Sequence, residues 1–257
     1  MIAFCLPAYN EGENIRSLLR KIEERCFEGA WQVRVYLVDD GSTDDTAEAV
    51  SSFEGRLPIT LLRNGINLGL GRALRRGILR ALDELGDEDI LITMDADNTH
   101  DPVHCIGMVE ALQAGSDVVI ASRFQEGARE IGLSLFRRLL SRCARIVLSS
   151  FFRTENVRDY TCGFRAYRAG LLKRAQRAYG DAFMTAPGFS VMSEILLKLR
   201  PLNPTIAEVP LTLNYNLKRG RSKLAIMKTI IEYFATLSRV YRQARKVGLE
   251  GAHQERR

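Results

Sequence analysis

Apolar and polar positions form alternating blocks along the first 120 residues of the chain. Short runs of Val, Ile, Leu and Tyr with few polar interruptions are typical of the buried strands of a parallel sheet. Five such runs predict five strands, at Ile2 to Leu6, Val33 to Val38, Ile59 to Leu62, Ile90 to Met94 and Val118 to Ala121. The stretches between them are longer and more polar.

Helical spacing of apolar residues fills the gaps between these strands. Asn14 to Cys26 and Gly71 to Leu85 place apolar side chains three or four positions apart, and Thr43 to Val50 is a shorter segment of the same kind. Strands that alternate with helices indicate stacked βαβ units. The sequence therefore predicts an α/β fold with a Rossmann-like parallel sheet flanked by helices.

The regular alternation stops after residue 122, and a region of mixed character follows. Leu133 to Phe152 predicts an amphipathic, arginine-rich helix, and Val191 to Leu199 predicts a second helix. Gly163 to Tyr167 and Thr205 to Leu213 predict two further β segments. The pattern shows no internal repeat, so we expect one large domain over residues 1–222.

The last predicted element, Lys223 to Lys246, carries an apolar stripe with a basic far end. From Asn214 to Arg257 the chain holds 11 lysines and arginines against three acids, so this block carries +8 and the rest −2 of the net +6. A basic, apolar-striped helix favours a membrane surface over a nucleic acid, because it has no aromatic stacking platform. We therefore interpret residues 223–257 as a membrane-surface element; the alternative is a helix packed on the core with a basic solvent face.

The composition limits where the protein works. No uncharged stretch exceeds the 12 residues from Ala182 to Ser193, whereas a membrane span needs about 20. The N-terminus lacks the pattern of a secretory signal, and the five cysteines contain no CxxC pair. We expect a cytoplasmic protein, peripherally associated with the membrane, whose cysteines are reduced.

Three predicted strand ends are rich in polar residues, and ligands of open parallel sheets bind at that edge. They read Pro7-Ala8-Tyr9-Asn10-Glu11, Asp39-Asp40-Gly41-Ser42 and Asp95-Ala96-Asp97-Asn98-Thr99. So many carboxylates at one edge would repel one another unless a cation lay among them. Asp95 and Asp97, two positions apart, suit a hard cation such as Mg²⁺ or Mn²⁺. The alternatives are a cap of the helix near Pro102 and, for Asp39, a turn before an N-capped helix.

Two weaker patterns point to other classes. His100 and His104 are four residues apart, but the HExxH glutamate of a zinc site is missing. Gly69-Leu70-Gly71 lacks the third glycine of a dinucleotide loop and follows the wrong strand for a dehydrogenase. We expect these glycines to let a strand-to-helix turn pass close to a ligand or to its neighbours.

The ordered set of motifs resembles family-2 glycosyltransferases, and most of all their branch of dolichol-phosphate mannose synthases and bacterial polyprenyl-phosphate sugar transferases. The resemblance runs from residue 2 to about residue 235. Besides the three strand ends, it rests on these motifs: Asn67-Leu68-Gly69 with Gly71 and Gly77, Ser122-Arg123, Asp159 with Cys162-Gly163-Phe164-Arg165, Glu208-Val209-Pro210 and Arg221-Ser222-Lys223.

The resemblance implies a GT-A fold, a GDP- or UDP-sugar donor, Mg²⁺ or Mn²⁺, and inversion at the anomeric carbon. It also implies roles for individual residues. The donor would be bound by Pro7, Tyr9, Glu11, Asp39, Asp40, Asp95 and the basic loop Arg221, Ser222 and Lys223; the metal by Asp95, Asp97 and Thr99; and the acceptor phosphate by Arg123 with Arg137 or Arg138, near Asp159. Thr99 stands where the family often has Gln, and its hydroxyl can still bind the metal or position a metal-bound water.

A phosphate acceptor is chemically reasonable, because a phosphate monoester is already anionic whereas a sugar hydroxyl needs a general base. Arginine side chains suit such an acceptor, because the guanidinium group can donate two parallel hydrogen bonds to phosphate oxygens. The expected partners are thus a nucleotide sugar, a polyprenyl phosphate, the membrane surface and a small membrane protein, and no nucleic acid. Two alternatives stay open: a glycosyltransferase with a soluble hydroxyl acceptor and Asp159 as essential base, and a non-catalytic donor-binding scaffold.

Overall fold

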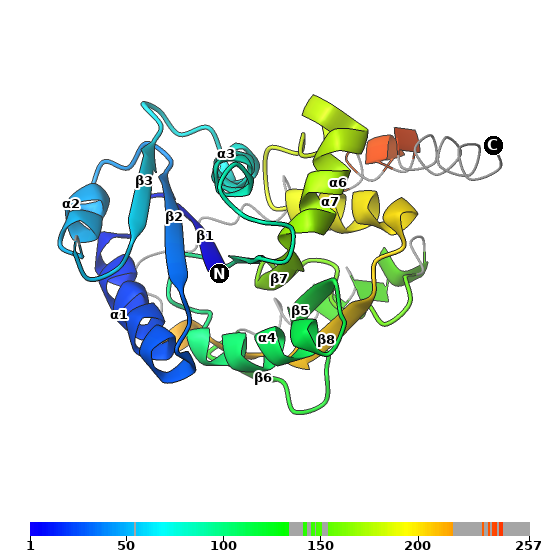
Figure 1. Cartoon of the computed structure of the whole chain (residues 1–257), viewed down its shortest axis with the longest axis horizontal. Coiled ribbons are helices and arrows are strands. Elements are labelled where there is room, and N and C mark those ends of the chain that lie inside the picture. Colours follow the sequence, from blue (N-terminus) through cyan, green and yellow to red (C-terminus); the bar gives the residue numbers. More distant parts are fainter. Residues whose placement is uncertain are drawn as a thin grey trace.

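A computed structural model describes residues 1–53, 55–133, 141–142, 145–146, 148–150, 154–217, 233, 236, 238–240 and 242–243. Its centre is a seven-stranded sheet with the order β3-β2-β1-β4-β7-β5-β8 (Figure 1). The strands are β1 (Ile2–Ala8), β2 (Val33–Asp39), β3 (Ile59–Arg63), β4 (Ile90–Thr93), β5 (Val118–Ser122), β7 (Arg165–Arg168) and β8 (Ile206–Pro210). The five strands predicted in the first half of the chain are confirmed.

One strand runs against the others. β7 lies between β4 and β5 and is antiparallel to both, so Arg165 at its start pairs with Thr93 at the end of β4. All other pairs of the sheet are parallel. As a result, the segment that precedes β7 lies at the carboxyl edge of the parallel strands.

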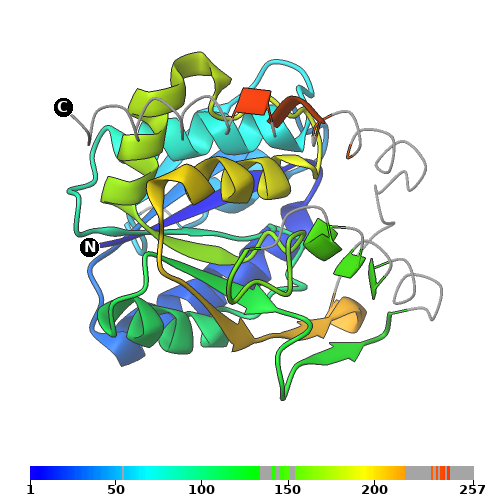
Figure 2. The same ribbon diagram turned by 90° about the vertical axis from the view of Figure 1, so that its right-hand side faces the viewer.

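Helices cover both faces of the sheet. α3 (Leu70–Leu82), α6 (Ala169–Tyr179) and α7 (Val191–Leu199) lie on one side, and α1 (Gly12–Gly29) and α4 (Cys105–Gln113) on the other (Figure 2). α2 (Thr46–Ser51) packs beside α1. The mostly parallel, helix-covered sheet confirms the α/β prediction.

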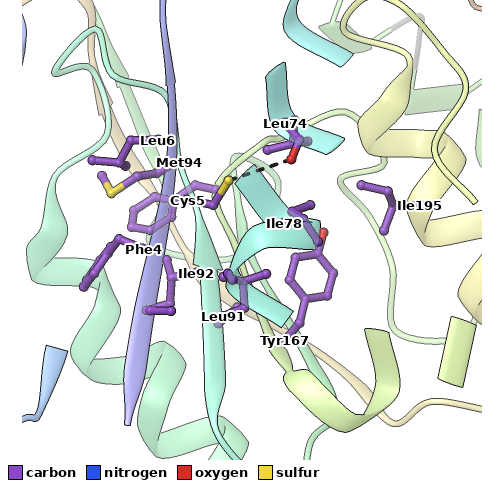
Figure 3. Packing of buried hydrophobic residues seen from close by; sticks show 14 of the residues in the cluster. Phe4, Cys5, Leu6, Leu74, Ile78, Leu91, Ile92, Met94, Tyr167 and Ile195 are labelled. Carbon is purple, nitrogen blue, oxygen red and sulfur yellow. Dashed lines mark hydrogen bonds between the residues drawn. The ribbon is translucent and has the colours of Figure 1, made fainter. Parts of the chain in front are cut away.

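The core between β1 and α3 shows how closely sheet and helix pack. Leu74 and Ile78 of α3 face Cys5 of β1, whose thiol donates to the Leu74 carbonyl at 3.9 Å (Figure 3). Gly77 permits this approach, because a Cβ at that position would lie 2.5 Å from the Cys5 sulfur. Burying one such aliphatic side chain contributes about 1.5–3 kcal/mol.

The four described cysteines, Cys5, Cys26, Cys105 and Cys162, are free thiols, and Cys143 lies outside the described residues. Burial raises the pKa of Cys26 to about 11 and the pKa of Cys5 and of Cys162 to about 12. They are therefore protonated packing residues.

In the second half of the chain, the predicted helix Val191 to Leu199 is confirmed as α7, and the β segment predicted at Gly163 to Tyr167 is β7 with shifted bounds, but other elements depart from the sequence prediction. Thr205 to Leu213, predicted as one β segment, is divided between β8 and β9 (Thr212–Asn214), because the chain leaves the large sheet after Pro210. β9 pairs with β6 (Arg129–Ile131), a strand of three residues that the sequence pattern did not indicate. α6 was also missed, although Leu171, Leu172 and Ala175 are buried at helical spacing.

The two predicted basic amphipathic helices, Leu133 to Phe152 and Lys223 to Lys246, lie largely outside the described residues. Of the second, Thr236 and Val240 are buried, whereas Arg239 and Arg242 are exposed. This part of the segment therefore packs on the domain and keeps its arginines in solvent. Within the residues that the structure describes, no helix is long and apolar enough to span a membrane.

Candidate active site

The first wall of the site consists of the turns that follow β1 and β2. Ala8 pairs with Asp39, so Pro7 and Tyr9, which flank Ala8, lie beside the end of β2. The turns are joined by hydrogen bonds from the Asn10 and Glu11 main-chain N–H groups to the hydroxyls of Ser42 and Thr46, both at 2.9 Å, and from Thr43 N to the Asn10 side chain at 2.7 Å. These bonds fix the two turns to each other.

Asp39 and Asp40 point to different places although they are neighbours. Asp39 is buried, accepts from Ser42 N at 2.9 Å and lies 3.6 Å from Arg63. Asp40 accepts from Asn64 at 2.7 Å and from the main-chain N–H groups of Leu68 and Gly69 at 3.0 and 2.8 Å. The Asp40 carboxylate thus holds the loop between β3 and α3, which is a different use from the donor contact predicted for it.

The third strand end carries the two carboxylates predicted to bind metal. Asp95 and Asp97 are both half-buried just beyond β4. Thr99 donates its main-chain N–H and its hydroxyl to Asp97 Oδ1, at 3.1 and 2.7 Å. The Thr99 hydroxyl therefore orients Asp97, a contact that belongs to neither of the two roles considered for it.

The histidines that follow are built into the same turn. His100 Nδ1 accepts from Asp95 N at 3.2 Å, and its ring stacks on Phe164 with centroids 5.2 Å apart. His104 Nε2 accepts from Thr212 N at 3.1 Å, and burial lowers the pKa of His104. Both rings are thus held by main-chain groups.

The donor set at the end of β4 fits a hard divalent cation. Gly163 borders it without a side chain, since a Cβ there would lie 3.4 Å from Asp95 Oδ1. Among the described residues, no group of three or more His, Cys, Asp or Glu side chains is close enough to hold a metal alone. Two carboxylates are what Mg²⁺ usually takes from a protein when substrate phosphates complete its coordination.

On the other side of β4 along this sheet edge lies an arginine–carboxylate pair. Arg123 follows β5, and its Nε and Nη2 donate to the two oxygens of Asp159 at 2.8 and 2.7 Å. Asp159 is fully buried and also accepts from Cys162 N at 3.0 Å. The structure therefore brings Arg123 and Asp159 together, 36 residues apart in sequence, in a bidentate pair.

The electrostatics of this pair oppose a role for Asp159 as a base. Burial alone would raise the pKa of Asp159, but the charge and hydrogen bonds of Arg123 lower the pKa to about 2. Glu208 supports the arrangement, because its Oε1 accepts from the main-chain N–H groups of Arg158 and Asp159, both at 2.7 Å. Burial raises the pKa of Glu208 itself.

The depressed pKa of Asp159 predicts a pH-dependent contribution to stability. The stabilisation is complete above the ordinary value of 3.8 and is lost as the pH falls through about 2, and it amounts to about 2 kcal/mol. We expect the gap in unfolding free energy between wild type and Asp159→Asn to narrow by about 1 kcal/mol from pH 5 to pH 3. Urea titrations at both pH values measure it, and a constant gap would contradict the assignment.

One cation of the site escaped the sequence analysis. Arg145 lies over the Phe124 ring at 4.9 Å, and Arg123 lies over the same ring at 5.6 Å. The only sequence signal for Arg145 was its place in the arginine-rich segment Leu133 to Phe152. Within that segment, Arg137 and Arg138 were the residues expected to bind the acceptor phosphate. Arg137, Arg138, Arg221, Ser222 and Lys223 lie outside the described residues.

The glycines after β3 serve a close main-chain contact. Gly71 N donates to the Pro187 carbonyl at 2.9 Å, and a Cβ on Gly71 would lie 1.8 Å from the Ala186 oxygen. Gly69, at φ 90°, has its Cβ position 2.9 Å from the Pro187 oxygen. Two reasons were considered for these glycines, a nearby ligand and a neighbouring part of the chain. At both Gly69 and Gly71 the reason is the neighbouring main chain of residues 186–187.

Comparison with known proteins agrees with this geometry. The model of the family described as "Glycosyl transferase family 2" matches residues 3–175. The dolichol-phosphate mannosyltransferase of Pyrococcus furiosus is 31% identical over 94% of this chain, and the undecaprenyl-phosphate mannosyltransferase of Micrococcus luteus is 29% identical over 86%. The matches cover 63% of the P. furiosus protein, less than two thirds, and 86% of the M. luteus protein.

A solved structure shares the fold. Glucosyl-3-phosphoglycerate synthase from Mycobacterium tuberculosis, crystallised with Mn²⁺, UDP and phosphoglyceric acid, superposes with a TM-score of 0.66 at 22% identity, covering 93% of this chain and 78% of that one. A crystal of the same enzyme holds Mg²⁺ and UDP. The central sheet, the strand-end motifs and the family match lead to one conclusion: the chain is a glycosyltransferase of the GT-A fold and belongs to glycosyl transferase family 2.

Proposed function

We propose that the chain transfers a sugar from a GDP- or UDP-sugar to a polyprenyl phosphate at a membrane surface, with Mg²⁺ or Mn²⁺ and with inversion at the anomeric carbon. The turns after β1 and β2 would bind the nucleoside through Tyr9, Glu11 and Asp39. Asp95 and Asp97 would hold the cation and, through it, the diphosphate. A bound cation would neutralise the charge of the leaving diphosphate.

The observation that carries the proposal is the fixed guanidinium of Arg123. Asp159 occupies its Nε and Nη2, which aims the fork, and Nη1 makes no hydrogen bond to any of the residues that the structure describes. A carboxylate with a pKa of about 2 is too weak a base to deprotonate a hydroxyl at neutral pH. A site with a fixed arginine and no base at Asp159 favours an acceptor that is already an anion.

The proposed reaction balances without a general base. An oxygen of the acceptor phosphate forms a bond to the anomeric carbon, while the bond from that carbon to the donor diphosphate breaks. The electron pair leaves with the nucleoside diphosphate. Arg123, together with Arg145 over the same Phe124 ring, would reduce the repulsion between the two anions.

A second observation supports the membrane as the source of the acceptor. Gly132 and Asn216 lie against each other, since a Cβ on Gly132 would be 2.2 Å from Asn216 Oδ1. The described chain therefore reaches residues 133 and 217 at neighbouring points beside the small β6–β9 sheet, ahead of the two predicted basic segments, Leu133 to Phe152 and Lys223 to Lys246. Exposed apolar side chains stand there, Ile131 at 39% and Leu217 at 38%.

This rim, defined as Ile131, Gly132, Asn216 and Leu217, adjoins the site. Asn214 N donates to the Thr99 carbonyl at 3.3 Å, and Leu213 bridges to His100. A lipid phosphate at a membrane surface beneath the rim would thus be close to Asp95 and Asp97. The rim and the two basic segments suit an anionic bilayer.

The rim predicts a membrane-binding defect. We expect the double variant Ile131→Glu, Leu217→Glu to bind anionic phospholipid vesicles at least about tenfold more weakly, because it replaces two inserting apolar side chains by charges. Vesicle co-sedimentation measures the change. Ile66→Glu is the matched control, since Ile66 is 69% exposed but follows β3 at the opposite edge of the sheet. Equal binding of the double variant and the control would contradict the rim.

The function itself is tested by product analysis. Purified protein is incubated with Mn²⁺, radiolabelled nucleotide sugars and polyprenyl phosphate in vesicles, and label is counted in the organic phase. We expect lipid labelling that a chelator abolishes. Label in a water-soluble product would favour a soluble acceptor instead, and absence of both products together with absence of donor hydrolysis would favour a donor-binding scaffold.

A further inference from the structure

A buried ion pair lies in α7 and is separate from the Asp95 and Asp97 carboxylates and from the Arg123–Asp159 pair. Glu194 and Lys198, one helical turn apart, are both completely buried. Burial lowers the pKa of Lys198, and Glu194 opposes part of that shift. A buried pair of this kind contributes little net stability compared with apolar residues, so its presence calls for another reason.

Glu194 uses most of its hydrogen-bonding capacity on the segment before α7. Its Oε2 accepts from the main-chain N–H groups of Thr185 and Ala186 at 2.8 and 2.7 Å, and its Oε1 accepts from the Thr185 hydroxyl at 2.7 Å. Lys198 completes the cluster on Oε1. The carboxylate therefore fixes the main chain at residues 185–186.

That segment packs against the turn at Gly69 and Gly71. Gly71 N donates to Pro187, and the Ala186 oxygen occupies the space that a Gly71 side chain would need. Gly69, on the same turn, donates its N–H to Asp40 at 2.8 Å, next to Asp39. Displacement of residues 185–187 would therefore shift the turn that supports the predicted nucleoside pocket.

α7 also reaches the carboxylates at the end of β4. The Met192 side chain lies 3.4 Å from the Cβ position of Gly163, which is itself 3.4 Å from Asp95 Oδ1. The Met192 carbonyl accepts a hydrogen bond from the buried Arg165. One helix thus contacts both the donor-side turn and the surroundings of Asp95.

We propose that Glu194 is a positioning residue for donor binding: it holds residues 185–187 against Gly69 and Gly71 and so fixes the turn beside Asp39 and Asp40. The inference rests on the proposed function, because it assumes that a nucleotide sugar occupies that pocket. Glu194 itself does not contact the donor. It acts through the main chain of Ala186 and Pro187.

Two double variants separate this role from the charge pair. Glu194→Gln with Lys198→Met removes both charges and keeps a side-chain oxygen that accepts from Thr185 N and Ala186 N. Glu194→Leu with Lys198→Met removes both charges and that acceptor. Neither leaves an unpaired buried charge, and both approximately conserve volume, so both are expected to fold.

The measurement is calorimetric binding of GDP and of UDP in the presence of Mn²⁺, with donor KM and kcat as a second readout. We expect the Gln/Met variant to bind within about threefold of wild type, and the Leu/Met variant to bind roughly tenfold more weakly with a raised donor KM. Leu112→Ala on α4, a buried site on the other face of the sheet, controls for lost stability, since it should lower the melting temperature without changing nucleotide affinity.

The outcomes distinguish the two proposals. Equal affinity of the Gln/Met and Leu/Met variants, with wild type binding normally, would overturn the positioning role and leave the proposed function intact. Reduced affinity in Leu112→Ala as well would overturn it too, because the effect would then follow stability. If wild type bound neither nucleotide with Mn²⁺, the proposed donor chemistry would fail and the positioning role with it.

Discussion

Asp97→Asn is expected to reduce metal-dependent sugar transfer on the order of a thousandfold. The variant removes a negative charge from the pair Asp95 and Asp97, and with it the attraction for a divalent cation. Its remaining carbonyl oxygen can still accept from Thr99 N and the Thr99 hydroxyl, so the turn should keep its shape. Initial rates over a Mn²⁺ titration measure the effect, and thermal melting checks the fold.

Asp101→Asn supplies the matched control for this variant. Asp101 is four residues further on, where its carboxylate accepts from Val103 N at the start of the 3₁₀ turn Pro102–His104. The same chemical change there should leave transfer within about twofold of wild type, since surface substitutions outside a site cost little. Full activity of Asp97→Asn at ordinary Mn²⁺ concentrations would remove Asp97 from the metal site.

Arg123→Lys and Asp159→Asn are each expected to lower kcat/KM for the acceptor roughly a hundredfold. Lysine keeps the charge of Arg123 but cannot form a fork. Asparagine at position 159 turns an N–H donor toward a guanidinium that also donates, so the fork loses its orientation. Because Asp159 acts through Arg123, the double variant should be about as impaired as either single variant.

The pH dependence gives an independent check on the same pair. With a pKa of about 2, Asp159 is ionised at every pH at which the enzyme is assayed. The pH–rate profile of the wild type should therefore have no acidic limb from this group above about pH 4. Losses that multiply in the double variant, together with an acidic limb that disappears in Asp159→Asn, would instead make Asp159 a base. Such a result would favour a hydroxyl acceptor.

The first half of the fold could be predicted because its signal is local. β1 to β5 are apolar runs that parallel strands require, and α1 and α3 show the spacing of helices with one buried face. The structure of the second half depends on which strands pair with one another, and this is not a local signal. Arg165–Arg168 has an apolar centre of only two residues, and nothing in it indicates that it enters between β4 and β5 in the reverse direction.

The candidate site, too, could be predicted from the sequence only in part. Position after a strand was enough to bring Asp39, Asp95 and Asp97 to one edge, because carboxyl ends of parallel strands meet there. Direction within the turn was not predictable from sequence: Asp40 points into the β3–α3 loop while its neighbour Asp39 lies beside Arg63. The Arg123–Asp159 pair likewise depends on the path of the chain into β7.

The reversed strand β7 also has a consequence for biosynthesis. β4 and β5 are made well before β7, yet each needs β7 as its neighbour, so both keep an unpaired edge on the nascent chain until residues 165–168 have left the ribosome. Contacts of such long sequence separation form slowly. We expect aggregation during synthesis to depend on the time between the synthesis of β4 and β5 and the emergence of β7. Growth at low temperature or added chaperones should therefore raise the soluble yield more than substitutions that stabilise the N-terminal strands do.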